Sequence, residues 1–137
     1  MTMTYQQEYE LSGLAGRAAI LNLTARHNRL YSAGDLAGWI ATFRHAGATF
    51  VRDGETYTDL AAAFDGGDGR RLVTVDHDIS VDGVDATQDC VALLYVGGEL
   101  RSTGTYRDQL VYERGGWYFT SRALAWDTVP TSGAVSV

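Results

Sequence analysis

Residues 104–122, GTYRDQLVYERGGWYFTSR, carry the pattern that decides the fold. Two runs rich in tyrosine, phenylalanine and valine flank the glycine pair Gly115-Gly116. Aromatic and β-branched residues favour extended backbone, and glycines between two such runs are typical of a hairpin. The segment therefore predicts two long antiparallel strands, at about residues 99–113 and 117–126.

The chain before this hairpin repeats the strand pattern. Apolar and polar side chains alternate from Val73 to Val81, and a further strand is expected over about residues 86–96. Glycines at 97–98 again supply a turn, so the strands form an antiparallel meander. His77 has the same parity as Val73, and we expect both side chains to face one side of the sheet.

The first half of the chain predicts helices. Apolar residues between Leu11 and Tyr31 recur at spacings of three and four, and Gly34 ends this long helix. Asp35 is a suitable N-cap for a short second helix, and a strand at 49–51 and a brief helix at about 58–64 follow. Helices before strands predict an α+β fold, in which a cone-shaped, curved antiparallel sheet wraps around the long helix and leaves a pocket at its wide end.

Composition narrows the domain organisation and the cellular setting. The 137 residues, 45% of them hydrophobic, suit one domain over residues 11–128, with an N-terminal extension at 1–10 and a flexible C-terminal tail at 129–137. The polar N-terminus does not have the pattern of a secretory signal, and no stretch reaches the roughly 20 apolar residues of a membrane span. A cytoplasmic protein with no membrane partner is expected.

Charge and residue usage disfavour several function classes. The net charge is −6 and the eleven cations, all arginines, are scattered, so nucleic acid is not an expected partner. Without lysine there is no Schiff-base chemistry, and no glycine-rich phosphate loop is present, so no cofactor is expected. A single cysteine, Cys90, excludes an intramolecular disulfide, and the three histidines do not have the spacing of metal ligands.

Four stretches of the chain resemble the SnoaL-like branch of the nuclear transport factor 2-like superfamily. They are GRAAILNL at 16–23, YSAGDLAGWIATF at 31–43, ISVDGVDAT at 79–87 and residues 104–122. The resemblance covers about residues 14–126 and implies a cystatin-like α+β barrel with an interior pocket. The superfamily includes polyketide cyclases, dehydratases, ketosteroid isomerases, a hexachlorocyclohexane dehydrochlorinase and non-catalytic subunits, so the resemblance leaves the reaction open.

The resemblance also implies which site residues are kept. The histidine and aspartate dyad of the dehydratase members falls on Val73, or on Leu72 if the register slips by one residue, and on Ser32, so the dyad is absent. The family's arginine on the last strand is kept as Arg122. Tyr106 falls where the family has an aromatic residue that lines the pocket.

The candidate catalytic residues are His77, His27, Arg122 and Tyr106. Either histidine could transfer a proton, although each could instead be a buried, hydrogen-bonded core residue. Arg122 could stabilise an oxyanion or form a structural ion pair with Asp108. The further residues expected to contact a ligand are Tyr31, Val73, Asp108, Leu124, Trp126 and Trp39.

Two interpretations of function remain open at this point. The first is a lyase, isomerase or cyclase that applies acid-base chemistry to a polycyclic, aromatic or terpenoid-like substrate. The alternative is a non-catalytic domain that holds a small hydrophobic ligand or serves as a subunit. A homodimer through the outer face of the sheet is also expected, because that face carries Leu93, Tyr95, Phe119 and Ala123.

Overall fold

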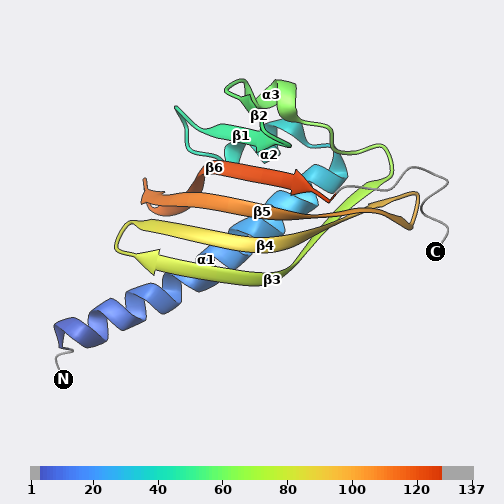
Figure 1. Ribbon diagram of the computed structural model, residues 1–137. Helices are drawn as coiled ribbons and strands as arrows, with labels where there is room; N and C mark the ends of the chain where they lie inside the picture. The colour runs from blue at the N-terminus through green and yellow to red at the C-terminus, as the bar shows by residue number, and fades with distance from the viewer. Residues whose placement is uncertain (1–3, 128–137) are drawn as a thin grey trace.

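Two layers make up the structure, a helical layer packed against one face of a six-stranded sheet (Figure 1). The computed structural model describes residues 4–127. The elements are α1 (Tyr5–Ala33), α2 (Leu36–Ala41), β1 (Thr49–Arg52), β2 (Glu55–Tyr57), α3 (Leu60–Ala63), β3 (Arg70–Asp82), β4 (Asp85–Val96), β5 (Glu99–Glu113) and β6 (Gly116–Trp126). The predicted α+β fold with a long N-terminal helix is confirmed. The tail expected at 129–137 lies outside the described residues.

Helix α1 begins earlier than its apolar pattern predicts. The Thr4 hydroxyl accepts a hydrogen bond from the backbone N–H of Gln7, and the Gln7 side chain accepts one from the backbone of Thr4. This capping box fixes the start of the helix at Tyr5 rather than Leu11, so residues 5–10 are helical. The first turns project beyond the sheet (Figure 1), and Gly34 ends the helix with a φ of 73°.

The sheet has the strand order β2-β1-β6-β5-β4-β3. The meander from β3 to β6 is antiparallel, as predicted, whereas β1 pairs with β6 in parallel. Strand β2 was not predicted; it pairs with β1 through the turn at Asp53 and Gly54, which take φ angles of 51° and 84°. Helix α3 is shorter than the helix expected at 58–64.

A bulge in β3 changes which side chains face inward. The pairing with β4 shifts between Val75 and Asp78, and Asp76 takes a φ of 54°. Before the bulge Leu72 is buried, so Val73 faces the outer side of the sheet. After it, His77 points inward. The expectations that Val73 shares a face with His77 and lines the pocket are therefore wrong.

A second bulge lies in β6. Gln109 pairs with Ser121 and Leu110 with Phe119, so Thr120 is an extra residue on that strand. Phe119 and Arg122 are both fully buried as a result. The expectation that Phe119 lies on the outer face is wrong, because the bulge turns its side chain into the core.

The core lies between α1, α2 and the inner face of the sheet. Ile20, Leu23, Trp39, Phe43 and Phe119 are each 2% exposed or less. Within residues 4–127, no helix combines the length and the apolar character that crossing a bilayer requires.

Candidate functional site

An enclosed cavity lies between the C-terminal end of α1, α3 and the inner face of the sheet. Its volume is about 10 Å³, room for about one water molecule. Its lining residues are Tyr31, Trp39, Phe50, Arg52, Ala63, Asp65, Leu72, Tyr106, Leu124 and Trp126. Tyr106 therefore lines the cavity together with four of the residues expected to contact a ligand. These are Tyr31, Trp39, Leu124 and Trp126, whereas Asp108 does not line it.

Arg52 and Asp65 are the polar residues at one end of this cavity. Arg52 Nη1 donates a hydrogen bond to the carbonyl oxygen of Ala63 at 2.9 Å and lies 3.7 Å from Asp65 Oδ2. Burial, and then the charge of Asp65, raises the pKa of Tyr31 to about 12. Tyr31 is therefore a neutral hydroxyl group at physiological pH.

Arg122 forms a buried ion pair behind the cavity. Its Nε lies 2.8 Å from Asp108 Oδ1 and its Nη2 lies 3.1 Å from Oδ2, with both side chains fully buried. The guanidinium stacks on the rings of Tyr106 and Phe119, at 3.6 and 4.5 Å from the centroids. Burial lowers the pKa of Arg122, but the charge and hydrogen bond of Asp108, together with Tyr106 and Cys90, raise it, and the net shift is upward, so the group stays charged. The structural pair considered from the sequence is present.

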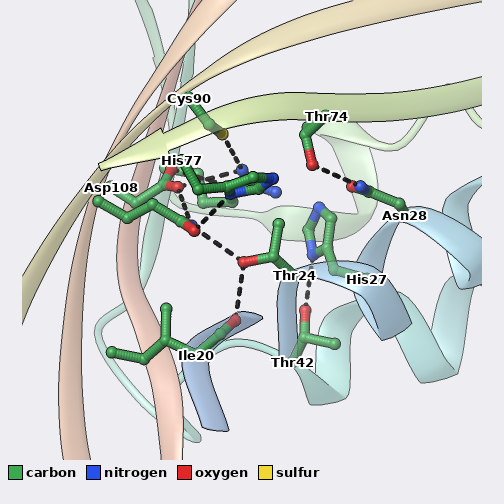
Figure 2. A network of polar contacts seen from close by, with 11 residues as sticks. Ile20, Thr24, His27, Asn28, Thr42, Thr74, His77, Cys90 and Asp108 are labelled. Atoms are coloured by element: carbon green, nitrogen blue, oxygen red, sulfur yellow. Dashed lines mark hydrogen bonds and ion pairs between the residues drawn. The ribbon is translucent and has the colours of Figure 1, made fainter. Parts of the chain in front are cut away.

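Gln88 connects this ion pair to His77. Figure 2 shows the network in which His77, Asp108 and Thr24 take part. The Nε2 atom of Gln88 donates to Asp108 Oδ2 and to Thr24 Oγ1, both at 2.9 Å, and its Oε1 lies 2.8 Å from His77 Nδ1. Since Oε1 can only accept, His77 carries its proton on Nδ1 and leaves Nε2 free to accept. Gln88 was missed from the sequence, although it alternates in phase with Ala86 and Cys90 and pairs with Asp108 across the strands.

His77 and Arg122 do not line one cavity. His77 lines a separate open groove of about 870 Å³ between α1 and β3, whereas Arg122 is enclosed in the core. The groove also contains Asn28, whose Nδ2 donates to Thr74 Oγ1 at 2.8 Å. The two predicted catalytic groups are linked only through Gln88 and Asp108.

His27 is a fully buried, neutral imidazole. Its Nδ1 lies 2.8 Å from the Thr42 hydroxyl, which itself donates to the carbonyl oxygen of Trp39. The Thr42 oxygen must therefore accept from His27, so the proton sits on Nδ1 and Nε2 carries a lone pair. Burial, and then the charge of Arg122, holds the pKa of His27 well below its usual value. The rings of Trp39 and Phe119 lie against it, each with its centroid 5.3 Å away.

Several buried side-chain polar atoms have no hydrogen-bond partner among residues 4–127, and one of them belongs to Trp39, which lines the cavity. They are His27 Nε2, Asn28 Oδ1, Trp39 Nε1 and Arg122 Nη1. Such atoms are rare in native proteins and mark positions that a water molecule or a ligand completes. Two of them are N–H donors on Trp39 and Arg122, and the bare nitrogen of His27 is an acceptor.

Other chemistry receives less support from the described residues. Burial raises the pKa of the Cys90 thiol to about 12, so it is not an activated nucleophile. No group of three or more potential metal ligands is found in the part of the chain that the structure describes.

Comparisons with known proteins agree with this architecture. The family model described as SnoaL-like domain matches residues 12–123. No functionally curated protein matches the sequence. Among solved structures, a nuclear transport factor 2-like protein with a cystatin-like fold from Novosphingobium aromaticivorans is 22% identical, with a TM-score of 0.80 over 100% of this chain and 99% of that chain.

Two further solved structures carry the names of particular proteins. A proposed scytalone dehydratase from Novosphingobium aromaticivorans is 17% identical, with a TM-score of 0.72 over 84% of this chain and 86% of that chain. LinA is 19% identical, with a TM-score of 0.70 over 88% and 92% of the two chains. Identities this low show a shared fold alone. With the family model matched over residues 12–123, the chain belongs to the SnoaL-like domain family.

Proposed function

We propose that this protein binds a small, largely apolar molecule inside the cone and transfers a proton to or from it, as a lyase, isomerase or cyclase does. The observation that carries the proposal is the set of unpartnered buried atoms on His27, Trp39 and Arg122. Trp39 lines the cavity, His27 packs against Trp39, and Arg122 stacks on the lining residue Tyr106. A buried polar atom without a partner costs about 1–3 kcal/mol. A ligand that brings one oxygen atom to this region would recover part of that cost.

The ligand has to enlarge the present cavity, which holds about one water. The Arg52–Asp65 contact at its end is long, 3.7 Å, and partly exposed to solvent. Contacts of this kind contribute about 0–1 kcal/mol, so they separate at little cost. Movement of Arg52 and of the four-residue helix α3 would open a path to Tyr106 and Trp39.

The protonation states suit proton abstraction next to a carbonyl group. His27 is neutral with a free lone pair on Nε2, the form that can accept a proton, and because its pKa is lowered the oxyanion formed beside it must stabilise the imidazolium. Arg122 remains charged, and its free Nη1 and the indole N–H of Trp39 can donate to the oxygen atom on which negative charge develops. Aromatic and aliphatic walls favour a polycyclic, aromatic or terpenoid-like substrate.

The test is exchange of the acidic C–H protons of bicyclic aromatic ketones, with 2-tetralone as the first probe, followed by NMR in D₂O. We expect the protein to accelerate exchange over buffer and His27→Gln to slow it by about 10²-fold or more. Trp39→Phe keeps the ring but removes one N–H donor and should reduce the rate by a smaller factor. Leu93→Ala, on the outer face, serves as the control and should leave the rate unchanged.

A second candidate is a non-catalytic ligand-binding domain. It is favoured by one observation, that Asp108 already occupies two N–H groups of Arg122. In that case 2-tetralone raises the thermal midpoint of unfolding but its protons do not exchange faster than in buffer. If no ketone of the series binds or exchanges, the interior is a filled core and both candidates are wrong.

A further inference from the structure

Helix α1 carries an apolar stripe that no described residue covers. Leu11, Leu14 and Leu21 are 50%, 58% and 43% exposed. They lie on the side away from the buried residues Ile20 and Leu23. Ala18 lies between these leucines and Ala25 follows them. The five residues recur at spacings of three and four, which places them along one face of the helix. The stripe consists of Leu11, Leu14, Ala18, Leu21 and Ala25.

The N-terminal part of this stripe belongs to turns that project past the sheet (Figure 1). These turns are tied to the body on one side only, where the Tyr9 hydroxyl donates to Asp82 at 3.3 Å. Short helical segments without tertiary packing are marginal in water. A packing partner on the apolar side would therefore stabilise the projecting turns.

The groove between α1 and β3 complements this projecting segment in charge and in apolar character. Leu21 and Ala25 form part of its wall, and Arg29, Arg70 and Arg71 line it, with no carboxylate among its lining residues in the described chain. The projecting residues 5–14 have the opposite character, since they contain two glutamates, two exposed leucines and no cation. An acidic, apolar helix segment fits a basic groove with an apolar wall.

We propose that two copies of this chain associate through α1, with the helices antiparallel and the projecting segment of each copy in the α1–β3 groove of the other. The arrangement is isologous, so both grooves are filled at once. A parallel arrangement would place the glutamates of the two copies side by side, whereas the antiparallel one places them against arginines.

Two features give similar registers for this pair. If Leu11 packs opposite the partner's Leu21, the two-fold axis passes at the level of residue 16, the midpoint of 11 and 21. Glu8 and Arg26 are 18 residues apart, five whole helical turns at 3.6 residues per turn, so they lie on one flank. If Glu8 meets the partner's Arg26, the axis passes at residue 17. The two axis positions differ by one residue, which shifts the pairing of the two helices by two residues, about 3 Å.

Sedimentation velocity on the full chain, over roughly 10–200 μM, tests the association. We expect a concentration-dependent dimer that Leu11→Glu with Leu14→Glu converts to a monomer. Leu100→Glu is the matched control, because Leu100 is 53% exposed but lies on β5. It should leave the dimer intact. Circular dichroism and the thermal midpoint show whether each variant remains folded.

A charge exchange makes the test specific to the register. Glu8→Arg alone and Arg26→Glu alone should each weaken the dimer at low salt, and the chain with both changes should recover it. A monomeric wild-type protein overturns the proposal. So does a dimer that survives the leucine changes but is lost in Leu93→Arg, because the outer face of the sheet then forms the interface, as predicted from the sequence. If the double charge variant stays monomeric, the proposed register is wrong.

Discussion

Phe119 and Arg122 lie three residues apart on β6, yet both side chains point into the core. In a regular strand they would face opposite sides of the sheet. The extra residue Thr120 reverses the alternation and brings the guanidinium to 4.5 Å from the Phe119 ring. The bulge thereby places Arg122 where it can pair with Asp108.

This buried pair predicts a large loss of stability when one partner is removed. Asp108→Asn leaves a charged Arg122 in the core without its counterion, and the free energy of unfolding should fall by about 3–5 kcal/mol. Urea denaturation at pH 7 measures it. The double variant Asp108→Leu with Arg122→Met should unfold with a free energy closer to that of wild type than either single variant. A loss below about 1 kcal/mol in Asp108→Asn would contradict a buried, mutually dependent pair.

His27 predicts a dependence of stability on pH. Burial lowers its pKa in the folded protein, while the unfolded chain keeps a pKa near 6.5. Below about pH 6.5 the unfolded chain takes up a proton that the folded chain does not, so the free energy of unfolding falls as pH falls. The slope from this group approaches about 1.4 kcal/mol per pH unit.

The measurement is the urea unfolding free energy of wild type and His27→Gln between pH 7.5 and about 5. The two other histidines are common to both proteins and cancel in the difference. We expect the curve of the variant to be flatter than that of wild type below pH 6.5. Parallel curves would mean that His27 titrates normally in the folded state.

The bulge at Asp76 predicts opposite effects for two substitutions. Asp76 has a φ of 54°, a region that β-branched residues avoid and glycine adopts freely. Asp76→Val should destabilise the protein by about 1–3 kcal/mol, whereas Asp76→Gly should leave its stability nearly unchanged. Thermal unfolding compares the two. Equal effects would show that backbone strain does not govern this position.

We expect any side chain introduced at Gly66 to clash with the backbone next to the cavity. A Cβ atom there would lie 2.2 Å from the carbonyl oxygen of Tyr31, a backbone atom that cannot move aside alone. Gly66→Ala should cost about 1–3 kcal/mol and weaken ligand binding by shifting Tyr31. Gly13→Ala is the matched control, since its Cβ meets only the end of Arg17 at 3.9 Å and alanine favours helix. That control should be neutral or stabilising.

The sequence by itself determined the elements and their order, apart from strand β2. The three- and four-residue spacing in α1, the alternation along β3 and the glycine turns are local signals, and each matches an observed helix, strand or hairpin. The resemblance to the SnoaL-like family, not these local signals, predicted that Tyr106 lines a pocket, and it lines the enclosed cavity. Even Arg122 and Asp108 could be paired from sequence, because adjacent strands of a hairpin fix which residues lie opposite each other.

Only the tertiary structure decided on which face of the sheet each side chain lies. Alternation is counted along the strand, so one extra residue at Asp76 or Thr120 reverses every position beyond it, and nothing local marked these bulges. Val73 and Phe119 were therefore misplaced. Gln88 as the link between His77 and Asp108, and the unpartnered nitrogen of His27, emerge only when separate strands and helices pack together and remove these groups from water.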